Sequence, residues 1–117
     1  MKKVLCVDDE ASLLQLYQDE LSEEGYEVIL AKDGQEALMK FEKDIPDVVV
    51  MDIRMPRMDG IHAMTALMAK DRKTQIILNS AYPIYRQNFM TWGATAFVTK
   101  SSDLSELKQK IREALKN

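Results

Sequence analysis

Short apolar runs alternate with longer amphipathic segments along the chain. Five runs of four or five residues are rich in aliphatic and β-branched side chains and lack a regular polar alternation: 4–7, 27–31, 48–51, 75–79 and 96–99. Such runs are typical of strands that are covered on both faces, as in a parallel sheet. The hydrophobic pattern therefore predicts five buried strands.

The segments between these runs carry apolar residues three and four positions apart, which predicts helices. The first helix is expected over about residues 12–24, with Gly25 ending it in the left-handed conformation. Asp33 is placed to cap the second helix, which Pro46 keeps from continuing. Three further helices are expected near 61–68, over 83–92, and from Leu104 to Leu115 with Ser102 or Asp103 as the cap.

Strands that alternate with helices in this way predict an α/β fold, a doubly wound five-stranded parallel sheet with helices on both faces. The chain has 117 residues and contains no Ser-, Gly- or Pro-rich linker, low-complexity segment or evident repeat. Residues 1–117 are therefore expected to form a single domain.

Composition narrows the class of protein. The net charge is −3, and the Lys and Arg residues are scattered, which argues against direct binding to nucleic acid. Cys6 is the only cysteine and lies inside an apolar run, so a buried reduced thiol is expected and a disulfide framework is excluded. No apolar run approaches the length of a membrane span, and the first residues do not resemble a signal peptide, so a cytoplasmic protein is expected.

Polar residues follow four of the five predicted strands directly. They are Asp8, Asp9, Asp52, Ser80 and Lys100. All strands of a parallel sheet point the same way, so these side chains are expected at one edge, where ligands bind in open α/β sheets. Each residue alone could be an ordinary solvated strand end, but three carboxylates, a hydroxyl and an amine together form a more specific set.

The chemistry of this set favours a metal ion and a phosphoryl group. Crowded carboxylates repel one another, and a divalent cation relieves that repulsion. Oxygen ligands with no His or Cys nearby favour Mg²⁺ or Mn²⁺ over zinc. A lysine and a hydroxyl beside the cation can bind phosphoryl oxygens, and a carboxylate can itself become an aspartyl-phosphate.

Four motifs then carry a family resemblance. They are Asp8-Asp9, the segment 52–60 (DIRMPRMDG), Asn79-Ser80-Ala81 and the segment 97–100 (FVTK). With these motifs at this spacing, essentially the whole chain resembles a receiver domain of bacterial two-component response regulators. The resemblance implies a flavodoxin-like (βα)5 fold with strand order 2-1-3-4-5.

The resemblance also implies a role for each site residue. Asp52 would be the phosphoacceptor, and Lys100 would pair with the phosphoryl oxygens. Asp8, Asp9, Asp52 and the backbone carbonyl of Arg54 would bind Mg²⁺. Ser80 would move to hydrogen-bond the phosphoryl group, and Phe97 would turn inward with it as the aromatic switch residue, although Phe97 could equally be plain core.

The partners implied are a phosphoryl donor and a target. The donor would be a His of a sensor kinase or a phosphotransfer protein. The domain would catalyse only its own phosphorylation and dephosphorylation, so it would not otherwise be an enzyme. The surface formed by the fourth helix, the fifth strand and the fifth helix would contact a downstream protein, unless the phosphoryl group is relayed onward.

Two alternatives stay open at this point. The first is a Mg²⁺-dependent phosphatase or phosphotransferase that forms an aspartyl-phosphate, although Arg54 stands where such phosphatases have a second carboxylate. The second is an interaction module with this fold that is not phosphorylated, which the intact acidic set disfavours. One departure from the family pattern is Ser101, since Pro commonly follows the lysine, and it leaves the geometry of that loop open.

Overall fold

The computed structural model describes residues 1–52, 65–67, 69, 74–81 and 93–116. In this part of the chain a five-stranded sheet has the order β2-β1-β3-β4-β5, and every pair of neighbours is parallel. The strands are β1 (Lys3–Val7), β2 (Glu27–Ala31), β3 (Val48–Met51), β4 (Gln75–Ser80) and β5 (Ala96–Thr99). The predicted fold class and strand order are confirmed.

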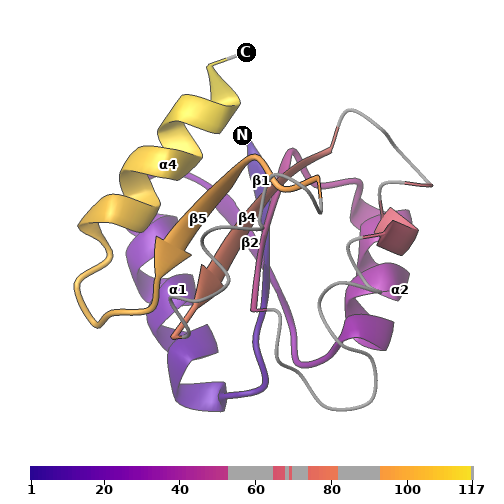
Figure 1. Cartoon of the computed structure of the whole chain (residues 1–117), viewed down its shortest axis with the longest axis horizontal. Coiled ribbons are helices and arrows are strands. Elements are labelled where there is room, and N and C mark those ends of the chain that lie inside the picture. The colour runs from indigo at the N-terminus through magenta and orange to yellow at the C-terminus, as the bar shows by residue number, and fades with distance from the viewer. Residues whose placement is uncertain (53–64, 68, 70–73, 82–92, 117) are drawn as a thin grey trace.

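Helices cover both faces of the sheet (Figure 1). Helices α1 (Ala11–Glu23) and α4 (Ser105–Leu115) lie on one face, and α2 (Gly34–Asp44) lies on the other. Residues 65–67 and 69 are also helical, and Leu67 is fully buried among the residues that pack under α2. The rest of the predicted third helix and the whole of the predicted helix 83–92 lie outside the described residues.

The central strand β3 shows why the strands lack polar alternation. Val48 and Val50 pack into the apolar cluster under α1 and α4, whereas Val49 and Met51 pack into the cluster under α2. Successive side chains of a strand point to opposite faces, and here both faces are covered, so every position of β3 is buried.

Helix α1 begins one residue before the expected start and ends at Glu23 rather than Glu24. Gly25 follows with φ +92°, a left-handed conformation that costs a glycine little, so the predicted stop is confirmed. The backbone N–H of Gly25 donates to the carbonyl of Ser22 at 3.1 Å and closes the last turn.

Helix α2 has the predicted cap. The Asp33 side chain accepts a hydrogen bond of 2.8 Å from the backbone N–H of Glu36, and the Glu36 carboxylate accepts one of 3.1 Å from the N–H of Lys32. The first contact satisfies a donor that the first turn would otherwise leave unpaired, and the second ties the residue before the cap to the helix. The helix ends at Asp44, before Pro46, as expected.

The predicted cap of α4 is wrong in position. Leu104, and not Ser102 or Asp103, is the residue that flanks the helix, and it has no side-chain capping bond. Leu104 takes that place because its side chain is buried in the cluster under α1 and α4. Asp103 still serves the first turn, since its carboxylate accepts a 2.9 Å hydrogen bond from the backbone N–H of Ser105.

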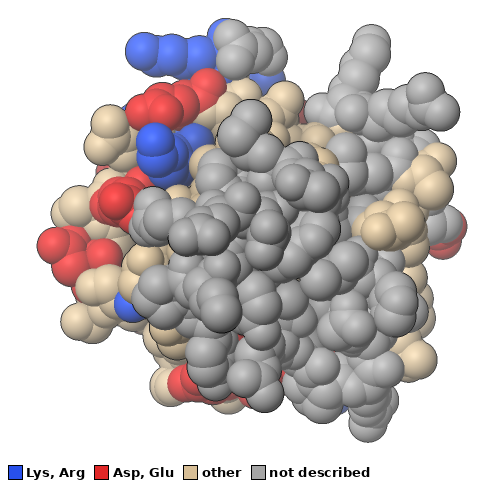
Figure 2. Space-filling model, viewed as in Figure 1, with Lys and Arg blue, Asp and Glu red and all other residues tan. Residues whose placement is uncertain are grey.

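Ion pairs join α4 to α1 at the surface. Lys108 Nζ lies 2.9 Å from Glu20 Oε1, and Arg112 Nη1 lies 3.0 Å from Glu24 Oε1. Figure 2 shows acidic and basic side chains interspersed on the side of the molecule where α4 lies. Such exposed pairs stabilise a fold only slightly, so the docking of α4 depends mainly on its buried face: Leu107, Ile111 and Ala114.

The cap of α2 can be tested by substitution. Asp33→Ala removes the carboxylate that accepts the Glu36 N–H, and we expect it to lower the free energy of unfolding by about 1 kcal/mol. Gln35→Ala, at an exposed position of the same first turn, is the matched control and is expected to change it by less than about 0.5 kcal/mol. Urea denaturation of both variants measures the difference, and equal stabilities would contradict the role of the cap.

Candidate functional site

Asp8, Asp52 and Lys100 each stand one residue beyond a strand, and their backbones continue the sheet. The N–H of Asp8 donates to Ala31 O at 3.0 Å, that of Asp52 to Val7 O at 3.3 Å, and that of Lys100 to Ser80 O at 2.9 Å. Each of the three residues is thus held by the last residue of a neighbouring strand. The polar edge that the sequence predicts is therefore built on a rigid part of the fold.

The Lys100 ammonium bridges two carboxylates from other strands. Its Nζ lies 2.7 Å from Asp8 Oδ2 and 2.7 Å from Asp52 Oδ2, and the three side chains are only 11%, 2% and 6% exposed, respectively. The other oxygen of Asp8 accepts a 2.9 Å hydrogen bond from the backbone N–H of Glu10. Both oxygens of Asp8 are thereby oriented, and Asp52 is held beside it.

The loop after β1 adds further carboxylates. Asp8, Asp9 and Glu10 offer oxygen atoms that lie within 4.8 Å of one another, and Asp9 and Glu10 are exposed. Three carboxylates, of Asp8, Glu10 and Asp52, lie within 3.9 Å of the Lys100 ammonium in the described part of the site, and Asp9 lies beside Asp8 and Glu10. This excess of negative charge and a donor set of hard oxygens fit a small divalent cation such as Mg²⁺.

Burial and ion pairing have opposite effects on the pKa values of Asp8 and Lys100. Burial raises the pKa of Asp8, and the hydrogen bonds from Lys100 and from the N–H of Glu10 offset this only in part, so the pKa stays above its ordinary value. Burial acts to lower the pKa of Lys100, but its hydrogen bonds to Asp52 and Asp8 outweigh that effect and raise the pKa. Lys100 is therefore a fixed cation.

Ser80 and Phe97 come from neighbouring strands. Ser80 is the last residue of β4 and is fully buried, and it is paired in register with Thr99 of β5. Phe97 is paired with Leu78 and packs with it in the cluster under α2, so its ring lies inward in this structure.

Two of the expected features concern the loops around the site. Arg54, whose carbonyl is the further predicted metal ligand, lies outside the described residues, as does most of the segment 52–60. The peptide bond between Lys100 and Ser101 is trans, like every peptide bond in the described part of the chain.

The structure also brings to the site three residues to which the sequence pattern assigned no role there. Glu10 joins the acidic loop, with its Oε1 3.9 Å from Lys100 Nζ. Asn79 Nδ2 donates a hydrogen bond of 2.6 Å to the hydroxyl of Tyr17, and both residues are buried. Tyr17 belongs to the apolar face of α1, and Asn79 ends an apolar run. The one signal for this pair was a buried amide directly before Ser80.

Comparison with known proteins decides the family. The response regulator receiver domain family matches residues 4–112 of the chain. The chain belongs to this family. Its members are signalling domains of two-component systems.

Solved structures of receiver domains share the whole fold. The response regulator TrrA of Thermotoga maritima in complex with Mg²⁺-BeF is 40% identical with a TM-score of 0.91, and the match covers 97% of this chain and 99% of TrrA. A second structure, of the histidine kinase ThkA in complex with TrrA, matches with 41% identity and a TM-score of 0.89, over 98% of this chain and 99% of the matched one.

Curated relatives are longer proteins. The transcriptional regulatory protein TrcR of Mycobacterium tuberculosis is 38% identical over 116 residues, which are 97% of this chain but 45% of TrcR. The chain spans about half the length of curated relatives such as this one. Among the described residues, no helix has the length and apolar character needed to cross a membrane.

Replacing Lys100 tests the ion bridge. Lys100→Met leaves Asp8 and Asp52 buried without their shared cation, and we expect a loss of about 3 kcal/mol in the free energy of unfolding near neutral pH. The pKa of Asp8 already lies above its unfolded value, so its ionisation opposes folding and the loss should shrink as the pH falls through that pKa. Denaturant titrations from neutral to acidic pH measure this trend.

The matched control is Lys108→Met, at an ion pair on the surface between α4 and α1. It is expected to cost far less than Lys100→Met and to show no such dependence on pH. Equal losses in the two variants at neutral pH would contradict the bridging role of Lys100.

Proposed function

We propose that this receiver domain accepts a phosphoryl group on Asp52 in a Mg²⁺-dependent reaction and changes conformation in response. The observation that carries the proposal is the Lys100 ammonium, 2.7 Å from both Asp52 and Asp8, at the edge of the sheet where the acidic loop lies. A cation held against one reactive carboxylate and beside a metal-binding set is what phosphoryl transfer requires.

In the transfer step a carboxylate oxygen of Asp52 attacks the phosphorus atom. A new P–O bond forms, and the bond from phosphorus to the donor breaks, its electron pair leaving with the donor. Lys100 neutralises charge on the phosphoryl oxygens without moving far, because its ammonium already contacts Asp52. Attack of water on the resulting acyl phosphate releases inorganic phosphate, returns Asp52 to a carboxylate and ends the signal.

Asp8, Asp9 and Asp52, with the backbone carbonyl of Arg54, would hold Mg²⁺. When bound, the ion supplies positive charge for the phosphoryl oxygens and relieves repulsion among the carboxylates. The close approach of the oxygens of Asp8 and Asp9, and the buried side chain of Asp8, support this assignment. The Mg²⁺-BeF complex of TrrA supports it further.

Ser80 and Phe97 are proposed to change position when Asp52 is phosphorylated. Ser80 would hydrogen-bond it, and Phe97, in the adjoining strand, would move with Ser80. Phosphorylation shifts such an equilibrium only by its differential affinity for the two conformations, and about 5.5 kcal/mol takes a population from 1:99 to 99:1. The output surface would combine the predicted helix 83–92 with β5 and α4.

The proposed donor is a phosphohistidine of a sensor kinase or phosphotransfer protein, since TrrA is known in complex with the histidine kinase ThkA. We propose that residues 1–117 act as one domain in the cytoplasm and signal by protein contact or onward phosphotransfer rather than by binding nucleic acid themselves. Its catalysis would be confined to its own phosphorylation and dephosphorylation.

Phosphorylation can be observed directly. Incubation with acetyl phosphate and Mg²⁺ should increase the intact mass by one phosphoryl group, because acetate is a good leaving group and Asp52 is the proposed nucleophile. The increase should disappear with EDTA and in Asp52→Ala, and it should persist in Asp19→Ala, which removes an exposed carboxylate from α1. No increase with any phosphodonor would favour the unphosphorylated interaction module.

Metal binding has its own readout. A ligand that binds only the folded state raises stability by RT ln(1 + [L]/Kd), about 2.7 kcal/mol at a hundredfold excess over Kd. We expect Mg²⁺ to raise the melting temperature of the wild type but scarcely that of Asp9→Asn. Asp9 is exposed, so this variant should fold normally.

Glu23→Gln is the control, since Glu23 is an exposed carboxylate of α1. It should respond to Mg²⁺ as the wild type does. An equal shift in Asp9→Asn and Glu23→Gln would rule out Asp9 as a ligand.

A further inference from the structure

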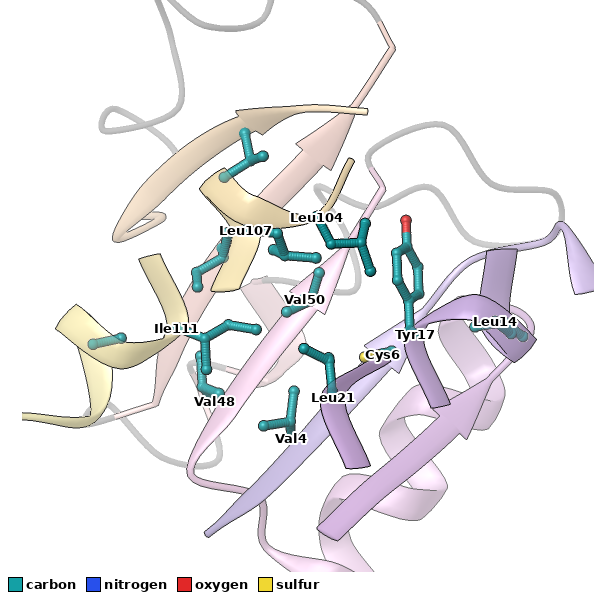
Figure 3. Packing of buried hydrophobic residues seen from close by; sticks show 13 residues of the cluster. Val4, Cys6, Leu14, Tyr17, Leu21, Val48, Val50, Leu104, Leu107 and Ile111 are labelled. Carbon is teal, nitrogen blue, oxygen red and sulfur yellow. The ribbon is translucent and has the colours of Figure 1, made fainter. Parts of the chain in front are cut away.

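A buried polar pair lies next to the phosphoacceptor site. The hydroxyl of Tyr17 in α1 accepts a hydrogen bond of 2.6 Å from Asn79 Nδ2 in β4, and the two residues are only 2% and 4% exposed. Figure 3 shows Tyr17 at one end of the apolar cluster, with its hydroxyl oxygen directed away from Leu21 and Val4. The phenol therefore connects the apolar face of α1 with the polar edge of the sheet.

Asn79 connects this contact to the site through the backbone. It directly precedes Ser80, and the two residues are paired in register with Val98 and Thr99 of β5. The carbonyl of Ser80 in turn accepts the backbone N–H of Lys100 at 2.9 Å. A hydrogen-bonded path thus runs from Tyr17 through the end of β4 to the residue that bridges Asp8 and Asp52.

The charges of Asp8 and Lys100 both affect the pKa of the Tyr17 hydroxyl. Burial raises the pKa of Tyr17, and the charge of Asp8 raises it further, while Lys100 acts to lower it. The net rise keeps the hydroxyl protonated throughout the physiological range. Tyr17 can therefore donate a hydrogen bond as well as accept one.

Packing alone does not require this pair. Leu14 and Leu21 already anchor α1 to the sheet, and Asn79 stands on the same face as Ile77, in an otherwise apolar cluster. Two apolar side chains of similar shape would dock the helix without the desolvation cost of two polar groups. A short buried hydrogen bond has a directional effect that apolar packing lacks, since it restricts one side chain relative to the other.

We infer that Tyr17 and Asn79 are positioning residues for phosphoryl transfer, holding the end of β4, and with it Ser80 and Lys100, in the geometry that receives the phosphoryl group. The inference rests on the proposed function at Asp52. Small displacements of preorganised groups slow a reaction strongly, because those groups must meet the charge where it develops. Metal binding depends on the carboxylates that follow β1 and β3 rather than on the end of β4, and it should not share this dependence.

The test is Tyr17→Phe, which removes one oxygen atom and keeps the ring. We expect its maximal rate of phosphorylation by acetyl phosphate, at saturating Mg²⁺, to fall about tenfold, less than the ~100-fold lost when a direct donor is removed. The half-saturating Mg²⁺ and acetyl phosphate concentrations should stay within about twofold of the wild type, since the hydroxyl is not proposed to contact either ligand. Tyr26→Phe, between α1 and β2 and partly buried against the same apolar cluster, is the matched control and should change nothing.

A second variant distinguishes one hydrogen bond from two independent effects. Asn79→Val keeps a strand-forming side chain and removes the amide. If the two residues act as a unit, the double variant is no slower than the slower single variant. Rates that multiply would overturn the pairing, and a lower melting temperature with an unchanged maximal rate would reduce the pair to a structural contact.

Measurements on the wild type distinguish a failure of the proposed function from a failure of this inference. No phosphorylation of the wild type would overturn the proposed function together with this inference. Phosphorylation of the wild type and of Tyr17→Phe at the same maximal rate would overturn only the inference.

Discussion

The bridge of Lys100 between Asp8 and Asp52 is the interaction on which the site depends. In the strand order β2-β1-β3-β4-β5, β1 and β3 are neighbours, so the carboxylates that follow them are necessarily close. Lys100 follows β5, two strands from β3, and only a long side chain can reach both carboxylates across the end of β4. The two 2.7 Å contacts therefore depend both on the order of the strands and on the length of the lysine side chain.

Lys100 stabilises the two buried carboxylates without balancing the charge of the whole site. One ammonium cannot neutralise Asp8, Asp9, Glu10 and Asp52, and burial makes the ionised form of Asp8 costly. The remaining negative charge favours a divalent cation, and the cation with Lys100 favours a phosphoryl group. The same excess of negative charge is a cost to stability that an apolar cluster of the same shape would not carry.

The protein surrounds this charge with rigid backbone. Asp8, Asp52 and Lys100 continue the hydrogen-bonding of the sheet, and the Tyr17–Asn79 contact adds a side-chain link from α1 to the end of β4. Such links restrict the positions of the site residues relative to one another.

The hydrophobic pattern by itself determined the strands and the edge at which Asp8, Asp52, Ser80 and Lys100 gather, because apolar runs without polar alternation indicate a parallel sheet covered by helices. The order of the strands came from the motifs that the chain shares with receiver domains. The sequence also determined the Asp33 cap and the stop at Gly25, which depend on residues close in the chain. Only the tertiary structure decided that Leu104 flanks α4, since that choice comes from burial under α1. The Tyr17–Asn79 bond likewise joins residues 62 positions apart, and no local pattern distinguishes such a tyrosine from an ordinary member of an apolar helix face.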